Sequence, residues 1–329
     1  MSRTSPRRPT IIDVAHAAGV SKSLVSAALR GDPGVSAESR RRVGEVAAAL
    51  GYRTNGWAQR LVSGRSALVG VLLTDLRNAY HTDIVNGIED AAEEAAYDVI
   101  LSHGRRDPDL LRRRLADLVE LGVDAVIAVT AHLDEPDLRQ AAARVPLVVV
   151  GRPARVPDGA GWVSNDDETG ARLAVQHLAD AGHTRIAFLA ASDRPAARAR
   201  RDAYRAAAPG RPREFDARTG GIADLLTATG LPDGPTAVFA ANDRLAAEVL
   251  ARAADHGVRV PEDLAVVGYD NTDLAGLVRP ALTSVDQPRA AMGRAAMAQA
   301  LTLLGGAATA HEVAVPTLVI RASSVPATP

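Results

Sequence analysis

The chain has 329 residues, of which 47% are hydrophobic, 38 are basic and 39 are acidic, so its formal net charge is −1. A chain of this length and hydrophobic content can build two or three domains with sizeable cores, which excludes a protein dominated by disorder. It contains no cysteine, which excludes disulfides, thiolate metal sites and thiolate nucleophiles and suits a reducing compartment.

The net charge hides an uneven distribution. Residues 1–65 carry 11 basic and 4 acidic residues, whereas residues 66–329 carry 27 basic and 35 acidic residues. A small basic part on a larger acidic part is typical of a nucleic-acid-binding head whose body is repelled by phosphate. The chain starts with no apolar signal segment and has no apolar stretch of membrane-spanning length, so we expect a cytoplasmic protein without a membrane partner.

Residues 10–30 predict two short helices joined by a tight turn, the arrangement that places a helix in a DNA groove. Thr10 and Asp13 fit a capping box at the start of the first helix, and Ser21 fits the N-cap of the second. Gly19 interrupts the apolar pattern between them. The apolar residues expected to form one buried stripe on each helix are Ile12, Val14, Ala15, Ala18, Val20, Leu24, Val25, Ala28 and Leu29.

Lys22, in the first turn of the second helix, is the only lysine in the chain. A flexible ammonium at this place can reach base edges and phosphates, and a contact from Lys22 to guanine O6/N7 is our default hypothesis. The alternative is chance, because a composition that replaces lysine by arginine nearly everywhere can leave one lysine anywhere.

A third helix is predicted after the turn at residues 31–34, with Ser36 as its cap and Gly51 at its end. Asn55 then caps a short segment, residues 56–61, in a linker. Three helices make a small headpiece.

From Ser66 onward, short apolar runs alternate with helical patterns. This alternation predicts βαβ units and parallel sheets that are covered on both faces. The expected strands are 67–73, 98–101, 125–129, 147–150, 186–190, 236–240 and 264–268, and the expected helices include 82–96, 108–121, 169–181, 242–256 and 288–304. Ligands of open α/β sheets bind beyond the carboxyl ends of strands, so the residues that follow these runs are candidates for a cleft.

The chain resembles the LacI/GalR family of bacterial transcription regulators in five blocks that follow the family's order. A helix-turn-helix alone would be weak evidence, but the four further blocks make the resemblance specific. The blocks are residues 10–30, GYRTNGWAQRL at 51–61, NDR at 242–244, RVPEDLAVVGYDN at 259–271 and PALTSVDQP at 280–288.

This resemblance implies an α/β chain with an all-α helix-turn-helix headpiece and a two-lobed body like a periplasmic sugar-binding protein, with parallel sheets. We expect the headpiece at residues 1–53, a hinge helix and linker at 54–65, and an effector-binding and dimerisation domain at 66–329. Lobe 1 is expected at about 66–163 and 289–316, and lobe 2 at about 164–288 and 317–329, with crossings near 163, 288 and 317.

The resemblance also implies contacts with DNA. The family's hinge helix enters the minor groove, where Leu61 matches a leucine wedged between central base pairs and Ala58 lies close to the groove floor. A bent duplex can repay the unstacking that such a wedge requires; the alternative for Leu61 is a linker leucine that packs on the body. Ala27 and Arg30 stand where arginine and asparagine are frequent, which leaves direct base readout mainly to the first turn of the second helix. The expected DNA-contact residues are Thr10, Ser21, Lys22, Ser23, Ser26, Ala27, Arg30, Asn55, Ala58 and Leu61.

The effector contacts are likewise implied by the resemblance. Arg200 and Asp270 match the family's most recurrent contacts, and their paired donors and acceptors suit the hydroxyls of a sugar. His81 stands where an aromatic is common and Gly151 where aspartate is frequent, while Phe215 is a weak candidate for the family's stacking aromatic. The expected effector-binding residues are Tyr80, His81, Arg152, Asp166, Arg194, Arg200, Asn242, Asp270 and Gln287.

Plainer interpretations exist for three of these residues. Arg200 could be a surface charge of a helix, Asp270 a turn residue, and Asn242 only the cap of the helix that it opens. Capping by Asn242 is compatible with ligand contact.

Together these patterns predict a sequence-specific DNA-binding transcriptional regulator, expected to be a repressor, that binds a near-palindromic operator as a homodimer and responds to a small polar effector, a sugar in the first place. The alternatives are a solute-binding protein of sugar transport and a regulator that senses a nucleoside or purine. An enzyme is not expected, because no dinucleotide-binding, P-loop, GxSxG or HExxH motif is present. We expect no cofactor and no metal.

Overall fold

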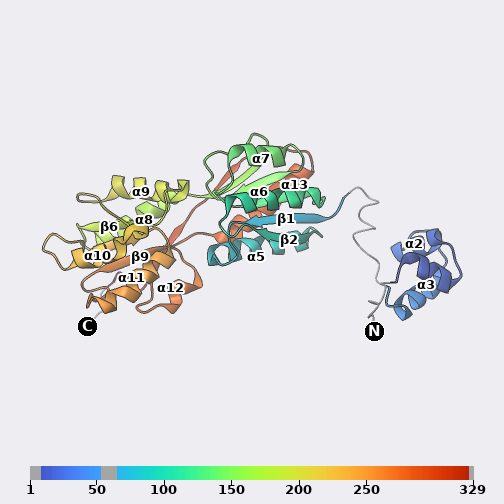
Figure 1. Cartoon of the computed structure of the whole chain (residues 1–329), viewed down its shortest axis with the longest axis horizontal. Helices are drawn as coiled ribbons and strands as arrows, with labels where there is room; N and C mark the ends of the chain where they lie inside the picture. The colour runs from blue at the N-terminus through green and yellow to red at the C-terminus, as the bar shows by residue number, and fades with distance from the viewer. Residues whose placement is uncertain (1–8, 53–64, 326–329) are drawn as a thin grey trace, which may run out of the picture. The chain divides into compact units, whose positions relative to one another are not determined.

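The computed structural model describes residues 9–52 and 65–325, which form two units that divide after Ser66 (Figure 1). Each unit has its own hydrophobic core. Three hinge residues expected from the sequence lie outside these ranges: Asn55, Ala58 and Leu61.

Residues 9–52 of the first unit form three helices: α1 (Ile11–Ala18), α2 (Lys22–Arg30) and α3 (Ala37–Ala49). Thr10 and Asp13 form the predicted capping box, in which the main-chain N–H of Thr10 donates a 2.7 Å bond to the Asp13 carboxylate. The Ser21 hydroxyl accepts a 3.1 Å bond from the main-chain N–H of Leu24 and caps α2. Gly19 has a φ of 66°, a left-handed conformation that glycine adopts without strain, and it ends α1. These caps and the turn are therefore confirmed.

The core of the headpiece lies between the three helices. Its buried members are Val14, Ala15, Ala18, Val25, Ala28, Val43 and Ala47. The expectation for Ile12 is wrong, because its side chain is 63% exposed. Successive helical residues are separated by about 100°, so Ile11 shares the inner face with Val14 and Ala18, while Ile12 points elsewhere.

The second unit contains two six-stranded sheets. In the first sheet the order is β11-β5-β4-β3-β1-β2, all parallel, with bounds β1 Leu68–Leu73, β2 Asp98–His103, β3 Ala125–Val129, β4 Leu147–Val150, β5 Gly161–Asn165 and β11 His311–Ala314. In the second the order is β12-β10-β9-β8-β6-β7, with bounds β6 Ile186–Ala190, β7 Arg213–Asp216, β8 Ala237–Ala240, β9 Ala265–Asp270, β10 Thr283–Asp286 and β12 Thr317–Val319. Only β12 is antiparallel to its neighbour among these paired strands.

Helices connect the strands of each sheet. The helices packed on the first sheet are α5 (Ala79–Glu94), α6 (Pro108–Glu120), α7 (Glu135–Ala142) and α13 (Arg289–Leu304). Those packed on the second are α8 (Asp167–Asp180), α9 (Pro195–Ala207), α10 (Gly221–Thr229), α11 (Asp243–Asp255) and α12 (Asp273–Leu277), and the 3-10 turn η1 (Ala217–Thr219) follows β7. Every strand and helix predicted from the apolar pattern is present, with small shifts at the ends. The α/β architecture with parallel sheets is confirmed.

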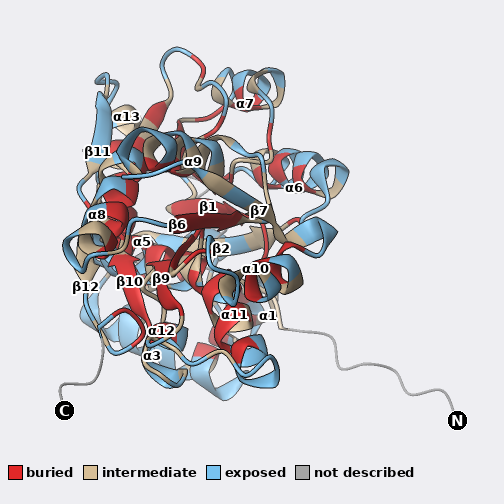
Figure 2. Cartoon of the chain, turned by 90° about the vertical axis from the view of Figure 1, so that its left-hand side faces the viewer, coloured by how far each residue is buried: buried red, intermediate tan, exposed pale blue. Residues whose placement is uncertain are grey.

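Helices cover both faces of the first sheet. Val71 and its neighbours on one face pack against α5 and α13, whereas Leu72 on the other face packs against α6 and α7. Buried residues line the strands and the inner sides of the helices (Figure 2). A single core of thirty buried residues, which includes Phe188 and Phe239, joins the second sheet to its helices.

We call the first sheet with its helices lobe 1 and the second lobe 2. The chain passes between them three times: from β5 into α8, from β10 into α13 and from β11 into β12. The first passage follows Asn165, slightly after the expected position near 163. No helix of the described residues has the length and apolar character that crossing a membrane requires.

Candidate functional site

A cavity of about 610 Å³ lies between the two lobes. Its walls come mainly from the residues that follow β1, β2, β3 and β4 in lobe 1 and β6, β7, β8 and β9 in lobe 2. Parallel strands bring their carboxyl ends to one edge of a sheet, and this is where open α/β sheets bind ligands. The cavity is therefore the candidate effector cleft.

Seven of the nine residues expected to contact an effector line this cavity: Tyr80, His81, Arg152, Arg194, Arg200, Asn242 and Asp270. The other two do not line it. Asp166 caps α8, accepting a 3.0 Å bond from the main-chain N–H of Thr169. Gln287 is buried behind the cavity and donates a 2.6 Å bond to the Asp270 carboxylate. Gln287 thus reaches the cleft only through Asp270.

Four contacts fix the side chain of Arg200 in the lobe 2 wall of the cleft. Its Nε donates a 2.8 Å bond to Asp167 Oδ1, and its Nη1 donates a 2.6 Å bond to the main-chain oxygen of Ala241. The same Nη1 lies 3.7 Å from Asp270 Oδ1, and the guanidinium carbon lies 3.5 Å from the centre of the Tyr269 ring. The interpretation of Arg200 as a surface charge is wrong, since only 9% of the residue is exposed.

Asp270 combines burial with an unusual backbone. Burial raises the pKa of its carboxyl to about 7, although the positive charge of Arg200 opposes this shift. Its φ is 104°, a left-handed value that a non-glycine residue adopts only when its surroundings hold it there. Asp270 can therefore present either a carboxylate or a neutral acid to a polar ligand near neutral pH.

Asn242 both caps α11 and lines the cleft. Its side-chain oxygen accepts a 2.9 Å bond from the main-chain N–H of Leu245, while its position at the end of β8 keeps it in the cavity wall. Its side-chain amide nitrogen has donors that this capping bond does not use.

On the lobe 1 side of the cleft, the Asp75 carboxylate contacts two arginine side chains. Its carboxylate accepts a 3.1 Å bond from Arg77 Nη2 and pairs at 3.1 Å with Arg106 Nε. The hydrogen bond from Arg77 is the main reason that the pKa of Asp75 falls to about 2. His81 Nδ1 lies 2.9 Å from the Asp75 carbonyl oxygen, which can only accept, so Nδ1 carries the proton. Burial lowers the pKa of His81.

Sequence reasoning missed several residues of this wall, among them Asp75, Arg106 and His132. A signal was available, since Asp75 and His132 follow the predicted strands 67–73 and 125–129 almost directly. Asp167, the partner of Arg200, was missed by one position in favour of Asp166.

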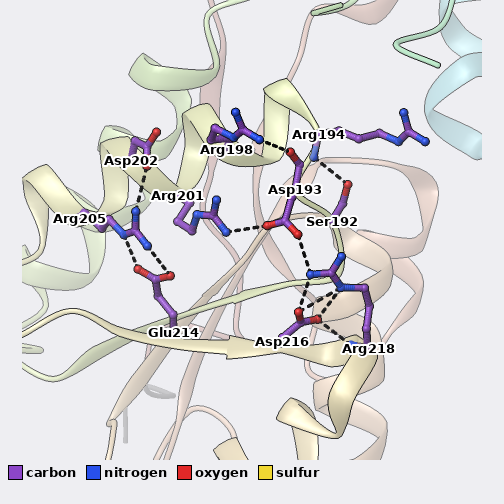
Figure 3. Close-up of polar contacts among 10 residues, drawn as sticks. All are labelled: Ser192, Asp193, Arg194, Arg198, Arg201, Asp202, Arg205, Glu214, Asp216 and Arg218. Carbon is purple, nitrogen blue, oxygen red and sulfur yellow. Dashed lines mark hydrogen bonds and ion pairs between the residues drawn. The ribbon is translucent and has the colours of Figure 1, made fainter. Parts of the chain in front are cut away.

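Phe215 is not part of the cleft lining. It borders a separate cavity of about 180 Å³ in lobe 2, so its suggested role as the stacking aromatic is not supported by its position. Beside this small cavity, Arg218 bonds to Asp193 at 2.7 Å and to Asp216 at 2.6 Å, and Arg201 bonds to Asp193 at 2.9 Å (Figure 3). This network fastens α9 to β7 and η1.

The headpiece presents its own candidate surface. Lys22 and Ser23 are exposed in the first turn of α2, while Ser26 and Ala27 are partly buried one turn later. Thr10 and Ser21 use their hydroxyls as helix caps. Arg30 is the last residue of α2. Within the described ranges no cluster of His, Asp and Glu could hold a metal ion.

Two protein families match the sequence. The family described as bacterial regulatory proteins, lacI family, matches residues 10–55, and the periplasmic binding protein-like domain matches residues 175–324. The chain is 33% identical over 302 residues to catabolite control protein A of Priestia megaterium, which covers 88% of this chain and 90% of that protein. It is 30% identical over 300 residues to the ribose operon repressor of Escherichia coli (strain K12), with 88% and 91% covered.

Solved structures agree with this result. The transcriptional regulator CelR in complex with cellobiose superposes with a TM-score of 0.70 and 31% identity, covering 96% of this chain and 100% of that chain. The lac repressor dimer bound to operator and the anti-inducer ONPF superposes with a TM-score of 0.82 and 28% identity, covering 97% and 100%. These relatives are transcriptional regulators and not enzymes.

Proposed function

This chain belongs to the lacI family of bacterial regulatory proteins, and from that membership we propose that it is a homodimeric repressor whose affinity for operator DNA is set by an effector bound between the lobes. One observation carries the proposal: a headpiece with an exposed Lys22 and a polar interlobe cavity occur in the same chain. A transport protein would need the cavity but not the headpiece.

The cleft chemistry favours an effector rich in hydroxyl groups. Arg200, Asn242 and Asp270 offer donors and acceptors from three neighbouring elements of lobe 2, which suits a sugar ring. Two relatives bear sugar names, the ribose operon repressor and the CelR–cellobiose complex. A purine or nucleoside remains the alternative; among the described residues, Tyr80 and two histidines are the rings that line the cavity.

Control of DNA binding follows from the connection between the lobes. Three passages of the chain join them around the cleft, so a ligand that contacts both walls changes the angle between the lobes. An effector must bind the two arrangements with different affinity to shift the equilibrium between them. The lobe angle then sets the spacing at which the two headpieces of a dimer meet the half-sites of a near-palindromic operator. Because the target is chromosomal DNA, we place the protein in the cytoplasm, and we assign it no catalytic activity.

The DNA function is tested with an operator selected from genomic fragments by the purified protein. Leu61→Ala should weaken binding to this operator much more than binding to a random duplex, because a wedge is productive only where the duplex bends. Arg41→Ala is the control, since Arg41 already pairs with Glu45 at 2.8 Å on α3. If the wild-type protein enriches no genomic sequence, it is not a sequence-specific repressor. If Leu61→Ala loses the same affinity for the operator and for the random duplex, Leu61 does not act as a wedge.

The effector function is tested by thermal-shift screening of sugars and nucleosides. A true effector should raise the melting temperature of the wild type and much less that of Arg200→Ala and Asp270→Ala. Equal shifts in all three proteins would mean that the ligand binds elsewhere.

A further inference from the structure

The mouth of the cleft carries cationic side chains that a neutral sugar does not require. We call Arg106, His132 and Arg194 the mouth cluster. Arg194 belongs to lobe 2, where it occupies the N-cap position of α9, yet its Nη1 donates a 3.2 Å bond to the main-chain oxygen of Ala131 in lobe 1. Ala131 directly precedes His132, so the cluster brings together both walls of the cavity.

Arg194 differs from the other arginines of the cavity wall. Each of the other five has a carboxylate within 3.3 Å: Arg106 with Asp75, Arg152 with Glu168, Arg200 with Asp167, Arg218 with Asp193 and Arg244 with Glu248. Arg194 forms no ion pair within the described residues; the charge of Asp134 acts on it, but only from a distance. Figure 3 shows the side chain of Arg194 extending away from the network that engages Arg198, Arg201 and Arg218.

His132 lies in the positive field of its two neighbours. Burial, followed by the charges of Arg194, Arg106 and His81, lowers the pKa of His132 to about 4. The His132 ring is therefore neutral near pH 7 and lies in the field of two guanidinium groups. A negative group placed among them would be stabilised by both guanidiniums and would favour a protonated ring.

Arg106 is fixed at the mouth by a strained segment. Arg105 and Arg106 have φ values of 51° and 65°, two consecutive left-handed residues that are not glycine, and such strain concentrates at ligand sites. The main-chain N–H of Arg106 donates a 3.0 Å bond to the Thr74 carbonyl oxygen. The single charge of Asp75 is shared between Arg77 and Arg106, so this side of the mouth keeps a net positive charge.

Hydroxyl groups complete the same wall. The Thr74 and Thr130 hydroxyls are 2.8 Å apart, Thr74 Oγ1 lies 3.5 Å from His132 Nδ1, and the main-chain N–H of His132 donates a 3.0 Å bond to Thr130 Oγ1. The Thr74 hydroxyl donates its proton to Thr130, which leaves the Thr130 hydroxyl proton for a ligand. Two guanidiniums, an imidazole and this hydroxyl form a donor set that matches the oxygens of a phosphate group.

We propose that the mouth cluster binds the phosphate of a phosphorylated sugar, whose ring hydroxyls occupy the lobe 2 wall at Arg200, Asn242 and Asp270. Because the phosphate contacts Arg194 of lobe 2 and Arg106 and His132 of lobe 1, its binding draws the walls together. This inference rests on the proposed function for the cleft, but it can be tested without DNA.

The test uses the purified full-length protein and isothermal titration calorimetry. The probes are inorganic phosphate alone and two matched pairs, glucose with glucose 6-phosphate and ribose with ribose 5-phosphate. In the wild type, the phosphorylated member of at least one pair should bind roughly tenfold or more tightly than the neutral member, and more tightly than inorganic phosphate, as expected for charge-assisted hydrogen bonds.

Arg194→Gln and His132→Asn should remove this preference. The matched control is Arg198→Gln, which deletes the same charge one turn along α9, outside the cavity wall, where Arg198 Nη2 donates a bond to the Asp193 carbonyl oxygen. It should bind like the wild type. Circular dichroism before each titration identifies any variant that has not folded, and Arg194→Gln changes an exposed residue.

Three results would overturn the proposal: neutral and phosphorylated sugars that bind equally, a preference that survives in both mouth variants, or inorganic phosphate that binds as tightly as every sugar phosphate. The last result would assign the cleft to free phosphate. Loss of operator selectivity in the same preparation would refute the repressor and leave the phosphate result intact, so the two failures are distinguishable.

Discussion

The guanidinium carbon of Arg200 lies 3.5 Å from the centre of the Tyr269 ring, and its Nε bonds to Asp167 at 2.8 Å. Through these contacts α9 is joined to the start of α8 and to the end of β9, which are separate in sequence. The Tyr269 hydroxyl in turn accepts a 2.7 Å bond from Asn165, the last residue of β5 in lobe 1. A side chain of the effector cleft is thus also part of the junction between the lobes.

We predict that Arg200→Ala lowers the free energy of unfolding as well as effector binding. Removal of the guanidinium leaves the buried Asp167 carboxylate with only the longer, 4.0 Å pair to Arg152 Nη1, and breaking a buried pair costs at most about 3–5 kcal/mol. Urea denaturation measures the loss, and Arg198→Ala on the exposed side of α9 should change stability by less than about 0.5 kcal/mol. Equal effects of the two changes would show that Arg200 has no structural role.

A second prediction concerns the contact of α5 with α13. A Cβ added at Gly87 would overlap the carbonyl oxygen of Ala290, and a Cβ at Gly293 would overlap the carbonyl oxygen of Ile84. Two glycines therefore allow these helix backbones to approach closely. Gly87→Ala and Gly293→Ala should each destabilise lobe 1 by about 1–3 kcal/mol, the usual effect of overpacking.

The control for these glycines is Gly276→Ala in α12, where an added Cβ meets nothing within 4 Å. Its melting temperature should equal or exceed that of the wild type, because alanine favours helix over glycine. If calorimetry gives the same melting temperature for all three variants, an added Cβ at Gly87 or Gly293 does not disturb the packing of α5 against α13.

The strands that could be predicted from the sequence are those with a continuous apolar run. Continuous apolar runs such as residues 125–129 and 147–150 became central strands buried on both faces. The edge strands β7, β11 and β12 were not predicted; REFD and HEVA are polar and partly exposed, as suits strands with only one neighbour. The inner strands β5 and β10 were also missed, although they are largely buried, because GWVSN and TSVD contain no continuous apolar run. The error at Ile12 arose because two adjacent isoleucines leave the inner face of a helix ambiguous.

The site was predictable where the family resemblance supplied a position. Arg200 and Asp270 were found in this way, but the mouth cluster was found only in part. Arg194 was predicted and His132 follows the predicted strand 125–129, whereas Arg106 reaches the cleft because β2 lies beside β1. Strand order is a property of the folded sheet that local patterns do not encode. The resemblance implied Asp166 and not Asp167, because the direction of each carboxylate is not visible in the sequence.

The third prediction concerns pH. The pKa of Asp75 is about 2 in the folded protein, below its ordinary value of 3.8. Its bonds to Arg77 and Arg106 therefore contribute stability that is complete above the ordinary pKa and is lost as the pH falls through about 2. Asp75→Asn should melt at a lower temperature than the wild type at about pH 6, and the two proteins should converge near about pH 2.

Calorimetry across this range is the measurement, with Asp233→Asn as an exposed control. The control should follow the wild type at every pH. A constant gap between wild type and Asp75→Asn down to the lowest pH would show that the carboxylate charge does not stabilise the fold.

The last prediction separates the two interpretations of Lys22. If Lys22 contacts a guanine edge, Lys22→Ala should weaken operator binding by about 1–3 kcal/mol and relax specificity at one base pair, with little change on random DNA. If it contacts only phosphate, binding should weaken on all sequences. The slope of the logarithm of the binding constant against the logarithm of the salt concentration should then decrease in magnitude by about one. We expect the first result, because Lys22 is exposed at the N-terminal turn of α2, where recognition helices contact bases.

A capping variant on another helix shows whether any loss reflects damage to the headpiece. Ser36→Ala removes the 3.2 Å bond to the Ser39 N–H at the start of α3, and Ser36 is not among the expected DNA-contact residues. It should cost the headpiece about 1 kcal/mol. A loss of operator affinity in Lys22→Ala, measured by fluorescence anisotropy, that exceeds the loss in Ser36→Ala therefore comes from the ammonium group. A smaller loss than in Ser36→Ala would remove Lys22 from the DNA-contact residues.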